Sequence, residues 1–158
     1  MTFRAHKDSL ALSHVHEVLQ AAFGWEDMHL HRFVTSDPFA PLRPVDGEFA
    51  EVQQWLPRQE CEETGDRPEE DCSLDQLLAL GSGGAFYEYD FGDSWLHRLE
   101  LVSRRPAAQD SLPARLIDGA RRGPLEDSED LPNTRRSWMH WPTRPTLTMP
   151  NIRRGSLK

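Results

Sequence analysis

Residues 86–102 read FYEYDFGDSWLHRLELV and are the most strongly patterned stretch of the chain. Aromatic and alternating residues stand on both sides of the turn formers Gly92, Asp93 and Ser94, which is typical of a β-hairpin. A two-residue loop would mix apolar and charged side chains on one face, whereas a three-residue loop separates them. We therefore predict a three-residue loop at 92–94.

This register fixes the predicted cross-strand neighbours. On the polar face it sets Glu88 opposite Arg98 and Asp90 opposite Leu96. On the buried face it pairs aromatic and apolar side chains: Phe91 with Trp95, Tyr89 with His97, and Tyr87 with Leu99. The imidazole of His97 is then the one polar group on an otherwise apolar face.

The composition is that of a single soluble domain. The chain has 158 residues, enough for a hydrophobic core, of which 37% are hydrophobic and 28% are charged. It shows neither an apolar run of membrane-spanning length nor a signal-peptide pattern, so we expect a cytoplasmic protein. In that compartment the two cysteines, Cys61 and Cys72, are expected to be reduced and unpaired.

Charge is distributed unevenly along the chain. The net charge is −8, but residues 133–158 hold six Lys or Arg and no Asp or Glu. Residues 1–128 hold 12 basic and 24 acidic residues, which gives this part a net charge of −12. Because so acidic a surface repels a phosphate backbone, nucleic acid is not an expected partner of residues 1–128.

Two helices are predicted from hydrophobic spacing and capping residues. The first spans about 10–23, where apolar residues recur at helical intervals, and Gly24 follows as a left-handed C-terminal cap. The second spans about 73–80 and begins with the capping box formed by Ser73 and Gln76.

Two short strands complete the predicted fold, one at Met28–Val34 and one within Phe49–Leu56, anchored by Trp55. The acidic run Glu60–Asp71 is expected to be a solvated loop, because its carboxylates repel one another. These elements predict an α+β fold, in which a small antiparallel or mixed sheet around the 86–102 hairpin is covered by the two helices.

A polar cluster near the hairpin turn is the candidate site for chemistry. Glu88, Asp90, Asp93 and His97 could together hold a divalent cation or serve acid–base catalysis. The predicted register weakens this interpretation, because it sends His97 to the face opposite Glu88 and Asp90. An Asp in a turn also commonly accepts bonds from its own backbone. We therefore favour structural roles for this cluster.

Four histidines near the amino terminus are weaker candidates. His29 and His31 alternate on a predicted strand and could chelate a metal, but no third ligand stands at a fixed spacing from them. His14 and His16 stand two residues apart on a predicted helix, so they cannot share a face and are interpreted as surface residues. We predict no bound metal and no cofactor.

Three stretches resemble the plasmid pRi Orf3-like family. They are YEYDFGDSWLHRLEL at 87–101, VHEVLQAAFGWEDMHLHRF at 15–33, and RLIDGARRGPLEDS at 115–128. The resemblance implies a small α+β domain without defined biochemistry, and some members lie in insertion sequences under the label "passenger TnpR family". It marks as structural signature Tyr87, Tyr89, Phe91, Gly92 and Trp95.

The chain also departs from this family. Positions at which many members carry cysteines are here Leu116, Gly123 and Ser128, so a metal site built on those cysteines is not expected. Of an amino-terminal strand followed by Trp-Arg-Arg, only Phe3-Arg4 is recognisable, which suggests truncation.

The sequence changes character after Ser128. The codons of Trp138–Pro142, read from the third base, encode Asp-Ala-Leu-Ala, which is typical of the family's acidic, helical terminus. A frameshift near Ser128 would explain this. We predict a domain over 1–128 and a disordered basic tail over 129–158.

Three classes of function follow from these observations. The favoured class is a noncatalytic accessory or binding module of a mobile element, with a protein partner or a second copy on an exposed sheet face. A metal-dependent hydrolase using the His and Asp groups near the hairpin is the first alternative. A nucleic-acid-handling protein is the second, although no helix-turn-helix or resolvase serine motif is recognisable.

Overall fold

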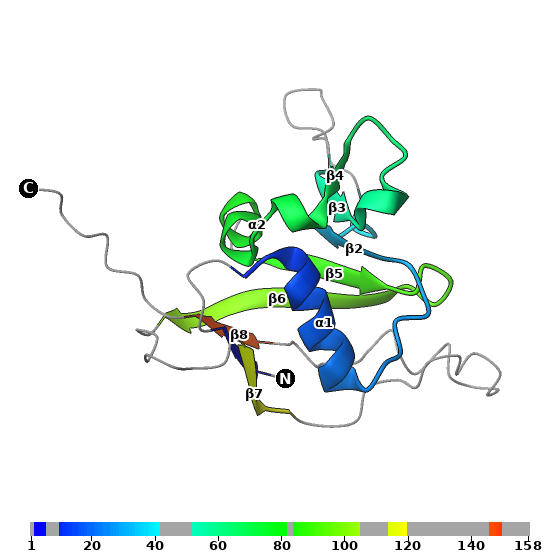
Figure 1. Cartoon of the computed structure of the whole chain (residues 1–158). Coiled ribbons are helices and arrows are strands. Elements are labelled where there is room, and N and C mark those ends of the chain that lie inside the picture. The colour runs from blue at the N-terminus through cyan, green and yellow to red at the C-terminus, as the bar shows by residue number, and fades with distance from the viewer. Residues whose placement is uncertain are drawn as a thin grey trace, which may run out of the picture.

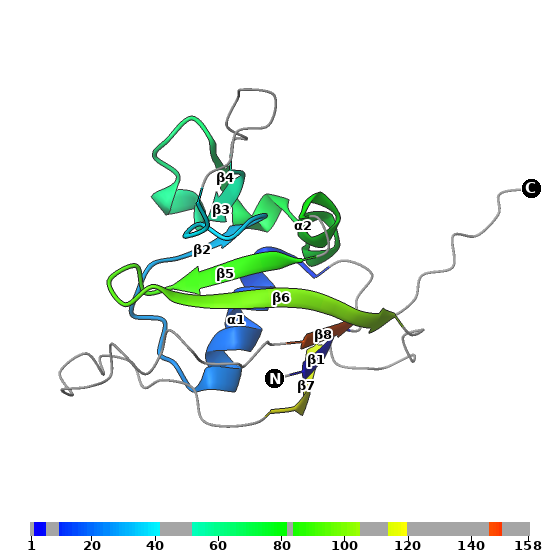
Figure 2. The same cartoon turned by 180° about the vertical axis from the view of Figure 1, so that it is seen from behind.

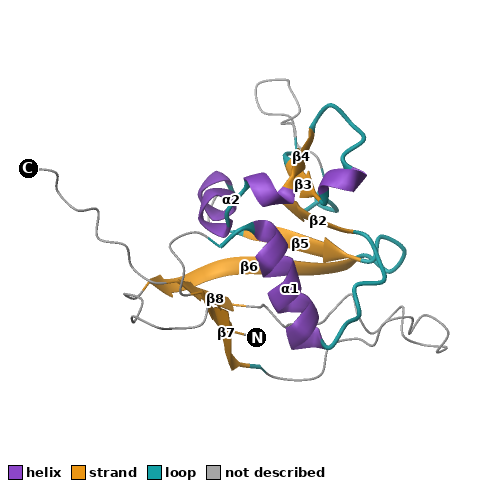
Figure 3. Ribbon diagram, in the orientation of Figure 1, coloured by secondary structure: helices purple, strands orange, loops and turns teal. Residues whose placement is uncertain are grey.

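The computed structural model describes residues 2–5, 10–41, 52–81, 84–104, 114–119 and 146–149. Two α-helices and a mixed β-sheet form this part of the chain, which confirms the predicted α+β fold (Figures 1 and 3). The helices are α1 (Leu12–Phe23) and α2 (Leu74–Leu80), with short 3-10 turns η1 (Arg58–Glu60) and η2 (Glu69–Asp71). The strands are β1 (Thr2–Ala5), β2 (His31–Val34), β3 (Gln54–Leu56), β4 (Asp66–Pro68), β5 (Ala85–Tyr89), β6 (Trp95–Arg104), β7 (Ala114–Asp118) and β8 (Thr146–Met149).

The β5–β6 hairpin lies at the centre of the sheet, whose strand order is β4-β3-β2-β5-β6-β8-β1-β7. On one side β2 pairs antiparallel with β5, and on the other β8 pairs parallel with β6. Helix α1 lies in front of β5 and β6 in Figure 1 and behind them in Figure 2, so it covers one face of the hairpin.

Strand β8 comes from the segment that the sequence predicts to be disordered. Its residues 146–149 pair parallel with both β1 and β6. The rest of the segment, 129–145 and 150–158, lies outside the described residues, and the prediction for it stays a prediction.

The hairpin has the predicted faces but a different register. Tyr87 lies opposite His97, Tyr89 opposite Trp95, and Glu88 opposite Leu96. Each pair is thus shifted by two positions from the prediction, so the expected Glu88–Arg98 pairing is wrong. A shift of two preserves the side-chain parity.

The cause of the shift is a longer loop, Asp90 to Ser94. The backbone of Asp90 is left-handed, with φ of 58°, and its carboxylate accepts hydrogen bonds from the amides of Gly92 and Asp93. The amide of Ser94 closes the loop on the carbonyl of Asp90 at 2.6 Å. Strand β5 therefore ends at Tyr89, two residues earlier than expected, and Phe91 projects from the loop with 39% of its surface exposed.

One end of each helix is capped as its sequence indicates. Gly24 ends α1 with φ of 74°, and its amide donates to the carbonyl of Gln20. In α2 the Ser73 hydroxyl accepts from the amide of Gln76, and the Gln76 side chain accepts from the amide of Ser73. The predicted capping box is thus confirmed.

The core lies between α1, α2 and the inner face of the hairpin. Its fully buried side chains come from each of these elements and from β2, and include Leu12, Leu19, Phe33, Leu74, Leu77, Tyr87, Tyr89 and Leu99. A stack of aromatic rings joins them to the loop after α1, where Trp25 lies 4.6 Å from Tyr89 and 5.1 Å from Trp95 between ring centroids.

Three local predictions are corrected or narrowed. The strand predicted at Met28–Val34 begins only at His31, and of Phe49–Leu56 the described strand is Gln54–Leu56. The acidic run Glu60–Asp71 is not a plain solvated loop, because it contains β4 and η2 and buries Glu69 to 6% exposure. The physical reason is a buried partner for Glu69, the imidazole of His31.

Cys61 and Cys72 form no disulfide in the described part of the chain, as expected. None of the helices in the described ranges combines the length and apolar character that crossing a membrane requires.

Candidate functional site

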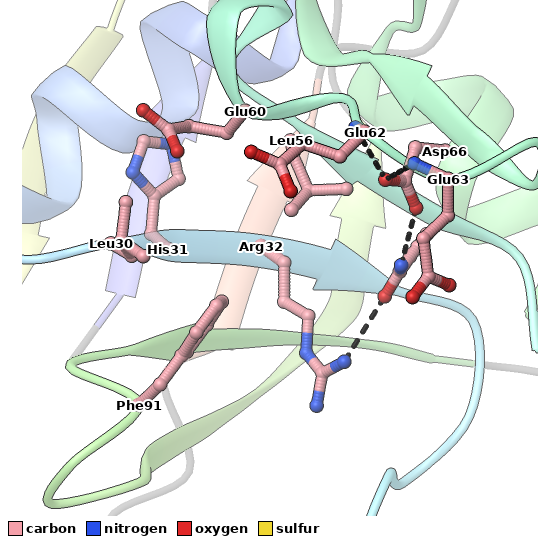
Figure 4. A pocket seen from close by; sticks show the side chains of 10 residues that line it. Leu30, His31, Arg32, Leu56, Glu60, Glu62, Glu63, Asp66 and Phe91 are labelled. Atoms are coloured by element: carbon pink, nitrogen blue, oxygen red, sulfur yellow. Dashed lines mark hydrogen bonds between the residues drawn. The ribbon is translucent and has the colours of Figure 1, made fainter.

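A depression of about 400 Å³ lies beside β2, between the η1–β4 segment and the hairpin loop (Figure 4). We call it the acidic depression. Its lining is Leu30, His31, Arg32, Gln54, Leu56, Glu60, Glu62, Glu63, Asp66 and Phe91. Four of these residues are acidic and one is a permanent cation, so the depression is strongly negative.

Asp66 organises one wall of the acidic depression. Its carboxylate accepts from the amides of Glu62 and Glu63 and from the side-chain amide of Gln54 (Figure 4). The bond from the Glu63 amide, followed by the one from Gln54, lowers the pKa of Asp66 below its ordinary value. Asp66 thus stays ionised and holds the loop that presents the neighbouring glutamates.

Arg32 does not neutralise the depression. Its Nε donates to Glu88 at 2.7 Å, and one terminal nitrogen donates to Gln54 at 3.0 Å. Its guanidinium also lies 5.3 Å from the centre of the Phe91 ring. In the described part of the chain, Glu60, Glu62 and Glu63 have no ion-pair partner.

A second polar group lies buried between α1 and β2. The imidazoles of His16 and His31 stack with 3.6 Å between centroids and 7° between planes. His16 Nε2 lies 2.9 Å from Asp27 Oδ1, and His31 Nε2 lies 2.9 Å from Glu69 Oε2. Each buried ring is therefore matched with one carboxylate.

Tyr87 connects this group to the hairpin. Its hydroxyl lies 2.8 Å from His16 Nδ1 and accepts from the Gln20 side chain at 3.3 Å. Burial raises the pKa of the Tyr87 phenol, and burial followed by the nearby His31 lowers the pKa of His16. A neutral phenol and a neutral imidazole therefore meet at this bond at neutral pH.

The predictions from sequence include neither the burial of His16 nor that of Glu69. The expectation that His16 is a surface residue is wrong, because only 6% of it is exposed. The signal was present, because His16 follows Leu12 by four residues and precedes Leu19 by three, which places it on the buried stripe of α1. Glu69 had no such signal, since its partner His31 is 38 positions away.

The candidate cluster predicted at the hairpin does not converge. Glu88 is buried against Arg32, and Asp90 is occupied by the loop amides. Asp93 belongs to that loop, and His97 lies on the opposite face of the hairpin, against Phe23 and Tyr87. His29 Nε2 lies 3.7 Å from Asp90 Oδ2.

His97 gives a pH prediction. Its Nε2 is buried, finds no hydrogen-bond partner in the described structure, and faces the rings of Phe23, Trp25 and Tyr87. Desolvation lowers its pKa from 6.5 to about 4. The folded state therefore disfavours protonation, so stability is fully present above pH 6.5 and is lost as pH falls toward 4, by about 3 kcal/mol.

A His97→Phe variant should lack this part of the acid sensitivity. Urea unfolding at pH 7, 5 and 4 should show wild type losing more stability than the variant on acidification. Parallel stability–pH curves for the two proteins would contradict the assigned environment of His97.

The chain is similar to proteins whose descriptions assign no activity. The model of the family described as plasmid pRiA4b ORF-3-like protein matches residues 5–142, beyond the change of composition at Ser128. The uncharacterized protein y4hQ of Sinorhizobium fredii (strain NBRC 101917 / NGR234) is 34% identical over 122 residues, covering 75% of this chain and 54% of y4hQ.

A solved structure shows the same fold. It is the crystal structure of MM3350, a protein of unknown function from Methanosarcina mazei Go1, with a TM-score of 0.54 and 23% identity. The match covers 77% of this chain and 61% of MM3350. The chain thus spans little more than half the length of these two relatives.

Proposed function

Because the chain belongs to the plasmid pRiA4b ORF-3-like family, we propose that it is a noncatalytic, cytoplasmic accessory module of a mobile element, and that it binds a basic segment of a partner protein. The family description itself names a plasmid, which supports the mobile-element part of the proposal. The binding surface is the acidic depression.

One observation carries the proposal: three glutamates face the acidic depression, and none of them has an ion-pair partner among the described residues. Glu62 and Glu63 are exposed, Glu60 is half-buried, and the only arginine in the lining is committed to Glu88 and Gln54. Lys or Arg side chains of a partner would supply the missing positive charge.

The apolar rim suits the same kind of ligand. Leu30 and Phe91 are 47% and 39% exposed at the mouth of the depression. The aliphatic stem of a Lys or Arg can lie along such residues while its charged head reaches the carboxylates. The aromatic ring of Phe91 can also attract a cation to its face.

The alternatives have less support. A hydrolase built on the hairpin residues would need Glu88, Asp90 and His97 on one side, and the hairpin separates His97 from the two carboxylates. A nucleic-acid partner would meet carboxylates at the depression, which repel phosphate.

A peptide-binding titration tests the proposal. A fluorescent arginine- and lysine-rich peptide should bind the full chain with an affinity that falls as salt rises. The Glu62→Gln/Glu63→Gln variant should bind about tenfold more weakly, a change of about 1.4 kcal/mol.

The matched control removes two exposed carboxylates elsewhere, in Glu17→Gln/Asp118→Asn, and should bind as wild type does. Equal weakening in both double variants would show general attraction by net charge and would refute a specific site. Salt-dependent binding of duplex DNA in place of the peptide would favour the nucleic-acid alternative.

A further inference from the structure

The acidic depression has an apolar end as well as an acidic one. Leu30 and Phe91, which are 47% and 39% exposed, lie at the end of β2 that is next to the hairpin loop. Glu62 and Glu63 lie toward the other end of this strand (Figure 4). We call Leu30 and Phe91 the apolar clamp. A ligand that lies along the depression therefore meets apolar surface at one end and carboxylates at the other.

The hairpin loop holds the apolar clamp in a fixed shape. The amide of Asp90 donates to the carbonyl of Leu30 at 2.9 Å, which ties the two halves of the clamp together through the backbone. The Asp90 carboxylate accepts from two loop amides, and the Ser94 hydroxyl donates to the carbonyl of Phe91 at 3.4 Å. Because the loop is already ordered, binding at the clamp costs little conformational entropy, as suits an anchor residue of a partner.

Arg32 limits what the apolar clamp can take. Its guanidinium lies 5.3 Å from the centre of the Phe91 ring, and its Nε donates to Glu88. The ring thus already carries one cation, and the surface that remains at the clamp is mainly apolar. A large apolar side chain would bury more of this surface than the thin stem of a Lys or Arg does. The cations of a ligand are matched instead by the glutamates at the other end.

We infer that the partner's basic segment carries one large apolar side chain, which packs on the apolar clamp while neighbouring Lys or Arg side chains reach Glu62 and Glu63. The inference rests on the proposed function and defines the partner segment more closely, as amphipathic and not only cationic. The four residues of β2, His31–Val34, span about 13 Å at about 3.3 Å per residue. An extended segment would therefore hold its apolar and basic residues within about four positions of one another.

Two fluorescent peptides of equal charge and length test this inference with the full chain. Both carry Lys and Arg on each side of one central position, which is leucine in the first peptide and serine in the second. Wild type should bind the leucine peptide about tenfold more tightly, as burial of one apolar side chain permits. Raised salt should weaken both peptides and leave their ratio nearly unchanged, because salt screens charges and does not weaken apolar burial.

Phe91→Ala and Leu30→Ala are the decisive variants, because each removes one side of the apolar clamp and neither changes a carboxylate. In each of them the ratio between the two affinities should fall to about threefold or less. The matched controls are Phe39→Ala and Leu80→Ala, which truncate side chains outside the depression that are 57% and 53% exposed. Both controls should keep the wild-type ratio. The ratio is measured within one protein, so either decisive variant is sufficient if the other does not fold.

The outcomes separate this inference from the proposed function. Equal binding of the leucine and serine peptides by wild type, or a wild-type ratio in Phe91→Ala and Leu30→Ala, would overturn the amphipathic segment and assign the apolar rim to Lys and Arg stems. Equal weakening of both peptides by Glu62→Gln/Glu63→Gln would still support the proposed function in that case. If this double variant changed the binding of neither peptide, the proposed function would fail, and the amphipathic segment with it.

Discussion

Replacing Trp25 with alanine should lower the free energy of unfolding by about 3–5 kcal/mol, as truncations of buried aromatic residues do. Trp25 is 7% exposed and stacks on three other rings, at 4.4 Å from Phe23, 4.6 Å from Tyr89 and 5.1 Å from Trp95 between centroids. These rings belong to α1, β5 and β6, so the cavity would open where the helix meets the hairpin. Urea unfolding followed by far-ultraviolet circular dichroism measures the loss.

Phe39→Ala is the matched control for this prediction. Phe39 is 57% exposed, so its truncation should change stability by no more than about 0.5 kcal/mol. If Trp25→Ala cost as little as Phe39→Ala, the aromatic stack would not be part of the stabilising core.

The aromatic stack also shows what the hairpin sequence could and could not predict. Alternation predicts a buried face that holds Tyr87, Tyr89, Trp95, His97 and Leu99, and the structure places them there. Alternation has a period of two, so it cannot distinguish registers that differ by two residues. The register depended on how Asp90 uses its side chain.

The candidate site was harder to predict than the fold. His16 could have been placed by helical spacing alone, since it lies on the same stripe as Leu12 and Leu19. The burial of Glu69 depends on His31, and the position of the exposed Asp27 depends on Gln20, contacts that only the folded chain creates. Strand β8 is likewise defined by parallel neighbours distant in sequence, which leave no local pattern.

The Arg32–Glu88 ion pair carries the other large expected effect. Glu88 is 3% exposed and Arg32 is 27% exposed, and their Nε and Oε2 atoms are 2.7 Å apart across β2 and β5. Arg32→Met should cost about 3–5 kcal/mol, because it leaves the carboxylate of Glu88 buried without a partner. Thermal and urea unfolding at neutral pH measure this cost.

Removing both charges should be much less harmful than removing one. In Arg32→Met/Glu88→Met no charge is left buried, so the double variant should regain much of the stability that Arg32→Met loses. An exposed pair gives the comparison: Arg58 and Asp71 lie 3.2 Å apart with 59% and 65% of their side chains exposed. A double-mutant cycle there should give a coupling below about 1 kcal/mol. If the stability losses caused by the Arg32 and Glu88 substitutions simply added up in the double variant, the two side chains would not interact in solution. The wall of the acidic depression that contains Arg32 would then carry a different charge from the one described.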